Sequence, residues 1–135
     1  MEGVKQMKRR SFIQALFGSA GATALGRQAL AHEPAVLLQE SQVAGFEFYR
    51  GEAIWPSLRV GKPLSLVREA SNAYDRDAVA VYVGGNQLGY VPQVENRAIA
   101  QMLDRGERLE ARIVELDDSG HPWNRVRMSI SLTQS

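Results

Sequence analysis

The sequence contains no cysteine and only two histidines among its 135 residues. Without cysteine, neither a disulfide nor a thiolate metal site can form, so the hydrophobic core alone has to stabilise the fold. The sequence also lacks a Gly-x-Ser-x-Gly elbow, a phosphate-binding glycine loop and a His-Glu-x-x-His motif, which argues against the common hydrolase classes. We therefore expect a protein with no catalytic residues, no bound metal and no cofactor.

Long hydrophobic runs are missing too, but the first 31 residues follow the pattern of an export signal. Arg9-Arg10 precedes a Gly/Ala-rich stretch over residues 15–25, and Ala29-Leu30-Ala31 provides a small-x-small cleavage site. The arginine pair resembles a twin-arginine leader, and the apolar stretch is too short for a stable membrane span of about 20 residues. We expect residues 1–31 to be removed and the protein to be exported to the periplasm by the twin-arginine route. An N-terminal amphipathic helix or a disordered arm is the alternative.

Removal of this leader changes the net charge. Five basic residues and one acidic residue leave with it, so 16 basic residues become 11, 15 acidic residues become 14, and +1 becomes −3. Nucleic-acid-binding proteins usually carry a basic excess, because contacts to phosphate supply much of their affinity. The mildly acidic mature chain argues against a protein that coats DNA, although a pocket for a strand end needs only a few contacts.

Hydrophobic periodicity predicts a small domain made mostly of strands. Residues 32–42 have no clear period and are expected to form an exposed lead-in, with room for a short edge strand over 35–38. Strands are predicted over residues 43–48, 64–68, 78–83, 87–91, 107–116 and 125–132. One amphipathic helix is predicted between Pro92 and Gly106, with Val94, Ala98, Ile99, Met102 and Leu103 on its apolar face. Five or six strands with one main helix indicate an α+β, mostly β fold, and periodicity alone allows several such sheets.

Residues 68–92 carry the most informative pattern of the chain. Arg68-Glu69 is followed by the loop Asn72-Ala73-Tyr74-Asp75, by a strand that begins Ala78-Val79, and by Gly89-Tyr90-Val91-Pro92. This pattern resembles the HIRAN domain, from about Gly45 to Gly106 and more weakly as far as Leu132. The resemblance implies a HIRAN-like domain over residues 43–135 with a small OB-like antiparallel barrel. HIRAN domains fused to DNA-repair helicases hold the 3′ end of single-stranded DNA, so the resemblance also implies binding of nucleic acid.

The loop supplies three candidate ligand-binding residues. Tyr74 offers a flat face on which an unpaired base can stack, and the neighbouring Asp75 can accept a hydrogen bond from a sugar hydroxyl. Asn72 can add amide contacts to a base or a phosphate. The alternative is structural: Asn72 and Asp75 satisfy backbone donors of their own loop, and Tyr74 packs on its rim.

Four further candidates lie outside the loop. Phe48 can stack on a base, and Tyr90 either lines the same groove or packs on the following helix. Arg68 contacts a phosphate or forms a surface ion pair with Glu69, and Arg50 lies near the first strand. Compared with the DNA-binding members of the family, this chain has an acid, Glu47, where a basic residue is expected. That acid would repel a phosphate, although Arg50 lies near enough to compensate.

Three functions remain open at this point. The first is a non-catalytic binding module for single-stranded nucleic acid, and the second is an exported module that binds a protein or envelope ligand. The third is a metal-dependent enzyme, for which Asp75 and Asp77 would be the carboxylates, although acids in such a loop usually serve the turn. A copper site made by His32 at a new N-terminus and His121 is the weakest hypothesis, because two imidazoles alone are a poor metal signature.

Overall fold

The computed structural model describes residues 35–119 and 121–134, and within them the chain forms one compact unit over residues 35–133. The expected leader, its cleavage site and His32 lie outside the described residues. The strands are β3 (Ala35–Gln42), β4 (Pro63–Arg68), β5 (Val79–Val83), β6 (Asn86–Tyr90), β7 (Leu109–Leu116) and β8 (Val126–Thr133). The α-helices are α1 (Gly51–Ile54) and α2 (Arg97–Asp104), and the short 3-10 helices are η1 (Phe46–Phe48), η2 (Trp55–Ser57), η3 (Gln93–Glu95) and η4 (Pro122–Asn124).

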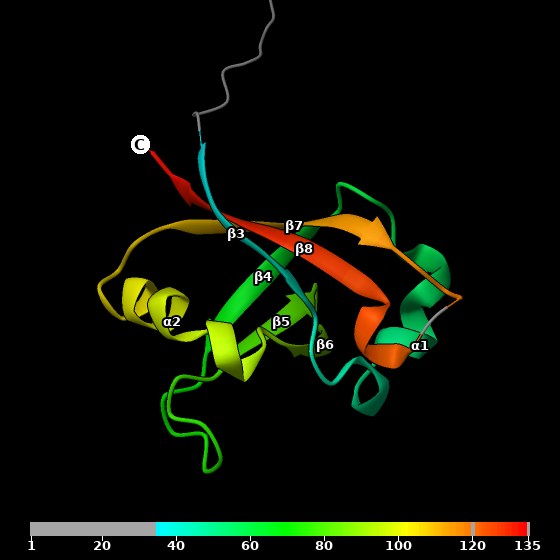
Figure 1. Ribbon diagram of the computed structural model, residues 1–135, viewed down its shortest axis with the longest axis horizontal. Helices are drawn as coiled ribbons and strands as arrows, with labels where there is room; N and C mark the ends of the chain where they lie inside the picture. The colour runs from blue at the N-terminus through cyan, green and yellow to red at the C-terminus, as the bar shows by residue number, and fades with distance from the viewer. Residues whose placement is uncertain (1–34, 120, 135) are drawn as a thin grey trace, which may run out of the picture. The chain divides into compact units, whose positions relative to one another are not determined.

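The six strands form one antiparallel sheet in the order β3-β8-β7-β4-β5-β6 (Figure 1). Strand β4 pairs with β7 through residues 63–64 and with β5 through residues 65–68, so the sheet changes partner within one strand. The two edges of the sheet meet at a single bridge between Ala44, just after β3, and Tyr90 at the end of β6. The N–H of Ala44 donates to the carbonyl of Tyr90 at 2.8 Å, and the reverse bond is 2.9 Å long. The sheet is therefore barrel-like, as the resemblance implied, and a single bridge joins its edges in place of a full ladder.

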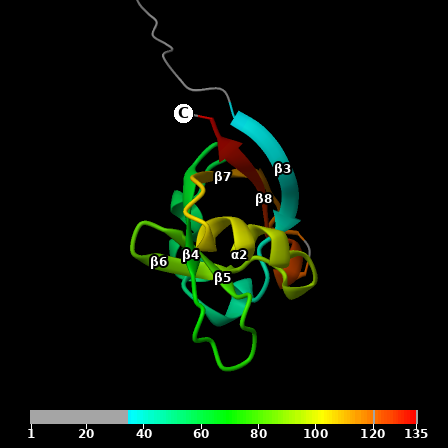
Figure 2. The same ribbon diagram turned by 90° about the vertical axis from the view of Figure 1, so that its left-hand side faces the viewer.

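The two α-helices lie at opposite ends of this sheet (Figure 1). Figure 2 looks onto α2, which lies in front of β4 and β5, and Ile99 and Ala100 are its buried residues. The core is apolar, and its buried residues come from β4 to β8, from α2 and from the loops, while β3 adds the partly buried Leu38. Its fully buried larger side chains are Val43, Phe46, Leu58, Val79, Val81, Leu88, Val91, Ile99, Ile113, Met128 and Ile130. On β5, Val79 and Val81 are fully buried, whereas Val83 is only partly buried.

The first strand differs from its prediction. The edge strand β3 covers residues 35–42 and is longer than the short strand over 35–38 that the expected lead-in allowed, and the predicted strand over 43–48 is wrong beyond Ala44. Gly45 has φ 74°, a left-handed conformation that ends the strand, and the helix η1 follows it. Phe46 then turns inward and is fully buried. Its ring packs so closely on Gly51 that a Cβ added to Gly51 would lie 2.2 Å from a ring carbon.

Phe46 belongs to a cluster that fixes the α1 end of the barrel. Its ring meets Trp55 edge-on at 5.9 Å between centroids, and the guanidinium of Arg125 lies 4.0 Å above the centroid of Trp55. Arg125 also forms an ion pair with Glu52 of α1. Because a guanidinium is attracted to an aromatic face, this stack ties the start of β8 to α1 and η2.

The predicted helix is present but starts later than expected. Pro92 leads into the separate 3-10 turn η3, and α2 begins only at Arg97. As a result Val94 is 93% exposed and is not part of the apolar face, and Ala98 is also exposed, whereas Ile99 is buried as predicted. The other predicted strands agree with the structure to within two residues at every end.

Candidate functional site

The loop between β4 and β5 is held by its own polar groups. The backbone of Glu69 donates to the carbonyl of Ala78 at 3.0 Å and closes the base of the loop. The side-chain oxygen of Asn72 accepts from the backbone N–H groups of Tyr74 and Asp75, at 2.8 and 3.1 Å. Asn72 therefore satisfies donors of its own turn, which is the structural role that asparagine often takes in loops.

Asp75 connects the loop to the start of helix α2. One oxygen, Oδ1, accepts from the backbone N–H of Asp77 at 2.9 Å, and the other, Oδ2, accepts from the side-chain amide of Asn96 at 2.8 Å. Asn96 is 2% exposed, and it is the residue immediately before α2. The position of Asp75 is thus set by two segments that are 21 residues apart in the sequence.

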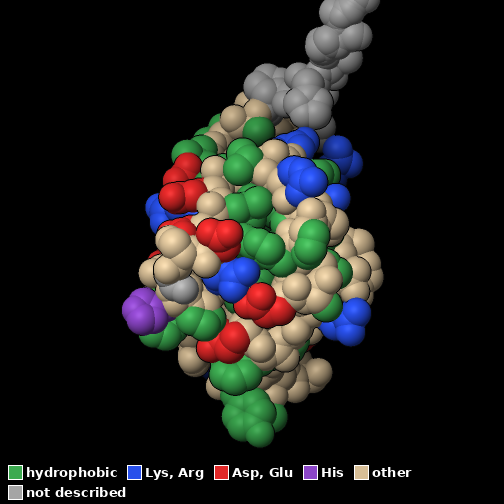
Figure 3. Space-filling model, turned by 90° about the vertical axis from the view of Figure 1, so that its right-hand side faces the viewer, with side chains coloured by type: hydrophobic (Ala, Val, Ile, Leu, Met, Phe, Trp, Pro, Cys, Tyr) green, Lys and Arg blue, Asp and Glu red, His purple; other side chains and the backbone are tan. Residues whose placement is uncertain are grey.

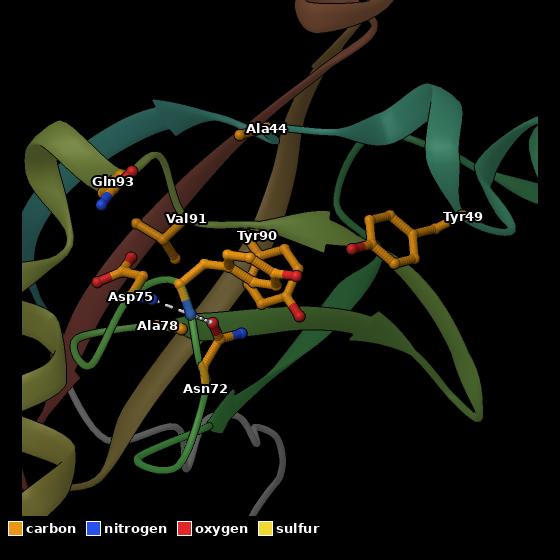
Figure 4. Close-up of a pocket in the computed structure, with 9 residues that line it drawn as sticks. Ala44, Tyr49, Asn72, Asp75, Ala78, Tyr90, Val91 and Gln93 are labelled. Atoms are coloured by element: carbon orange, nitrogen blue, oxygen red, sulfur yellow. Dashed lines mark hydrogen bonds between the residues drawn. The ribbon is translucent and has the colours of Figure 1, made fainter.

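A pocket of about 400 Å³ opens between this loop and the bridge that closes the barrel. Its apolar residues Ala78 and Val91 are almost fully buried, and two tyrosines from different elements face it. Tyr49 points its hydroxyl end toward Tyr90, with 5.8 Å between the ring centroids and 69° between the planes (Figure 4). The pocket is lined by Ala44, Tyr49, Asn72, Tyr74, Asp75, Ala78, Tyr90, Val91 and Gln93.

The hydroxyl of Tyr90 donates a 2.8 Å hydrogen bond to Glu69, which also accepts from the side-chain amide of Asn72 at 3.1 Å. Burial, together with this bond to a carboxylate, raises the pKa of Tyr90 from 10.0 to about 12. Both causes favour the neutral phenol, since a phenolate would lose solvation and would face the negative charge of Glu69. Tyr90 is therefore an uncharged wall of the pocket at any physiological pH.

Four of the seven predicted ligand-binding residues line the pocket, namely Tyr74, Asp75, Asn72 and Tyr90. Tyr74 is 94% exposed, so the alternative in which it packs on the loop rim is wrong. Phe48, Arg50 and Arg68 do not line the pocket, and Phe48 is 77% exposed on η1. Glu47, the acid at the expected basic position, is also exposed on η1 and away from the pocket lining.

Arg68 has a structural role that the sequence did not reveal. Its guanidinium binds both carboxylate oxygens of Asp104 at the end of α2, at 3.0 and 3.3 Å, and donates to the carbonyl of Ala78 at 3.1 Å. The expected partner, Glu69, instead serves Tyr90 and Asn72. Arg68 thus joins β4, the base of the loop and α2, and it is not free to bind a phosphate.

Sequence reasoning missed Tyr49, Glu69 as an acceptor, and Asn96. Tyr49 replaces Phe48 in the site because η1 interrupts the strand, so the alternation of inward and outward residues is lost after Gly45. The paired glycines at 45 and 51 are the signal that the chain turns here. Nothing in the sequence near Asn96 indicates that its amide is buried against Asp75, because that contact exists only after folding.

The charges around the site are unusual for a nucleic-acid-binding protein. None of the lining residues is a lysine or an arginine, whereas Asp75 lines the pocket and Glu69 is bound to its wall. Arg76 and Arg97 are exposed on the two segments that flank it. On the face that carries α1, acidic, basic and hydrophobic side chains are interspersed (Figure 3).

Residues 35–119 and 121–134 can be checked for a metal site, for the surroundings of His121 and for membrane-spanning helices. No group of three His, Cys, Asp or Glu side chains that could hold a metal ion occurs in this part of the chain. His121 stacks on Trp123 with 4.5 Å between centroids and 6° between planes. Over the same residues, none of the helices has the length and apolar character needed to cross a membrane.

Comparisons with known proteins agree with this architecture. A protein from Lactobacillus plantarum is similar in structure, with a TM-score of 0.68, 28% sequence identity, and coverage of 76% of this chain and 99% of that one. The HIRAN domain of human HLTF has a TM-score of 0.58 and 22% identity, with coverage of 73% of this chain and 78% of that chain. No curated protein matches the sequence. The sequence profile of the HIRAN domain matches residues 36–134, which are most of the chain. The chain therefore belongs to the HIRAN domain family.

Proposed function

We propose that this protein is a non-catalytic binding module that recognises the end of a single-stranded nucleic acid, the 3′ end of DNA in the first instance, in the tyrosine-lined pocket. The observation that carries the proposal is the position of Tyr74, which is 94% exposed and stands at the rim of a pocket formed by Tyr49 and Tyr90. An exposed aromatic face beside a cavity is the arrangement on which unpaired bases stack.

The polar groups of the pocket support binding more than catalysis. Both oxygens of Asp75 accept hydrogen bonds that hold the loop, and Glu69 is shared between Tyr90 and Asn72. Each Asp75 oxygen keeps a second lone pair, so Asp75 can still accept a hydrogen bond from a sugar hydroxyl. Arg76 and Arg97, exposed beside the pocket, supply the cations for phosphates of the strand that leads away from it.

The test is a titration of a fluorescent oligonucleotide with the protein and with Tyr74→Ala. Loss of one stacking face should cost roughly 1–3 kcal/mol, about five- to 150-fold in affinity. Because the side chain is almost fully exposed, the unfolding midpoint should not change. Val94→Ala is the matched control, since Val94 is 93% exposed but does not line the pocket.

Two further titrations decide what the pocket recognises. A blocked 3′ end should weaken binding if the end enters the pocket. Glu47→Arg should strengthen binding and steepen its salt dependence, because it replaces a repulsive charge on η1, outside the pocket lining, with a contact to a phosphate of the strand that leads away from the pocket. If the parent protein binds no oligonucleotide at low salt, the nucleic-acid proposal is wrong, and the alternative is a protein or envelope ligand.

A further inference from the structure

The walls of the pocket have the composition of an aromatic cage. Three of its nine lining residues are tyrosines, and they come from three different segments: Tyr49 after η1, Tyr74 in the loop and Tyr90 at the end of β6. Tyr49 and Tyr90 meet at 69°, so their rings form a corner and are not stacked on each other. The floor beneath them is apolar, with Ala78 at 2% and Val91 at 1% exposure.

The charged groups that line this cage or bind to its wall are negative. Asp75 lines the pocket, and Glu69 accepts the hydrogen bond of the Tyr90 hydroxyl at 2.8 Å. No lysine or arginine is among the lining residues. The nearest arginine to the loop base, Arg68, is neutralised by its two bonds to Asp104. Arg76 and Arg97 are exposed on the flanking segments and outside the lining, so solvent screens their charges, and the carboxylates and the negative faces of the tyrosine rings set the potential inside the pocket.

We propose that this pocket also binds a quaternary ammonium group, such as the trimethylammonium head of choline. Such a cation is attracted by the faces of aromatic rings, needs no hydrogen-bond acceptor of its own, and gains from nearby carboxylates that it does not have to touch. A volume of about 400 Å³ is within the usual range of small-molecule pockets. The inference does not rest on nucleic-acid binding, because it uses the negative charge of the pocket, which attracts a cation and repels a phosphate.

The experiment is NMR titration of the full chain with choline chloride and, in parallel, with 3,3-dimethylbutan-1-ol, which has the same shape without the charge. Sodium chloride at equal ionic strength controls for salt effects. We expect saturable shifts of the Asn72, Asp75 and Tyr90 amides with choline, and at least about tenfold weaker binding of the neutral alcohol. Equal binding of the two compounds, no binding of either, or equal displacement by sodium would overturn the proposal.

Variants separate an aromatic cage from a general acidic patch. Tyr74→Leu removes a ring from a side chain that is 94% exposed, so the fold is retained, and it should weaken choline binding severalfold, whereas Tyr74→Phe should not. If Leu and Phe behave alike, the ring does not bind the cation, and the proposal fails. Glu69→Gln should weaken choline binding but leave binding of the neutral alcohol unchanged. An equal effect on both would show that Glu69 acts only by shaping the wall.

The source of the cation is decided by a separate arm. Binding of free choline without binding of phosphatidylcholine vesicles assigns the site to soluble compounds, and additional binding of those vesicles assigns it to the lipid headgroup. Both results support the proposal, and vesicle binding that requires an anionic lipid instead contradicts it. Oligonucleotide binding is measured independently. Binding of choline without binding of an oligonucleotide would contradict the nucleic-acid proposal and support this one.

Discussion

Tyr90 and Glu69 form a titratable contact of the pocket, and the sign of its effect on stability follows from the pKa of Tyr90. The folded state raises the pKa of Tyr90 to about 12, from 10.0, by burial and by the hydrogen bond to Glu69. A raised pKa means that the fold favours the protonated phenol. This contribution to stability is complete below about pH 10, the pKa of an unfolded tyrosine, and is lost as the pH rises through 12.

We therefore expect one tyrosine of the folded protein to ionise near pH 12. A titration monitored by the ultraviolet absorbance of tyrosine measures this step. Tyr90→Phe should lack this step. Glu69→Gln should move it to lower pH, because a neutral amide no longer opposes the phenolate, although burial still raises the pKa. A step that is present in Tyr90→Phe would assign the raised pKa to another residue.

Among the elements, the bridge between β3 and β6 depends on one glycine. A Cβ on Gly89 would lie 2.2 Å from the carbonyl oxygen of Ala44, which accepts the hydrogen bond of Tyr90. The φ of Gly89 is 156°, a conformation that side chains rarely adopt. Since Ala44 and Tyr90 also line the pocket, closure of the barrel and formation of the site are one event.

Gly89→Ala should destabilise the protein by about 1–3 kcal/mol, because either the backbone is strained or the bridge opens. The matched control is Gly85→Ala, in the hairpin turn between β5 and β6, where an added Cβ meets nothing within 4 Å. The control should change stability by no more than about 1 kcal/mol. Urea denaturation measures both, and equal midpoints for the two variants would show that the bridge can move freely.

A hydrogen bond between Asn96, just before α2, and Asp75 in the loop between β4 and β5 also holds the site together. Asn96→Ala removes the donor that binds Asp75 Oδ2 at 2.8 Å in a nearly buried position. Leaving this acceptor without its partner should cost about 1–3 kcal/mol of stability.

Asn96→Ala should also weaken ligand binding, because Asp75 is then free to move. Asn124→Ala, at an exposed position of η4, should change stability by less than about 0.5 kcal/mol and leave binding unchanged. Thermal unfolding together with the oligonucleotide titration checks both expectations. A variant at position 96 that binds like the parent would show that α2 does not position Asp75.

For the whole molecule, we propose export of the chain followed by removal of residues 1–31, on the basis of the arginine pair at 9–10 and the Ala29-Leu30-Ala31 site. Expressed in a bacterium with a twin-arginine pathway, the protein should be recovered from the periplasm with an intact mass that begins at His32. Replacement of Arg9 and Arg10 by lysine should stop export. An unprocessed protein that stays in the cytoplasm would contradict the proposal and would keep the net charge at +1.

Most strands could be predicted from the sequence because each has a local cause. Alternating valines mark β5, Gly84-Gly85 marks the turn into β6, and the family motif lies between recognisable strands. Local pattern failed where a tertiary contact competed with it. Residues 46–48 look like a strand, but the burial of Phe46 beside Gly51 favours a 3-10 turn. The misassignment of Val94 has a local cause instead, because Pro92 starts a separate 3-10 turn and α2 begins only at Arg97.

The sequence by itself determined the family, the strand-rich class, and the loop that carries Asn72, Tyr74 and Asp75, because these follow from residue types at short spacing. Only the tertiary structure decided which side chains meet. It brought Tyr49 to the pocket in place of Phe48, and it assigned Arg68 to Asp104. The reason is physical: closure of the barrel joins Ala44 to Tyr90, 46 residues apart, and no local pattern encodes a contact made by closing a sheet.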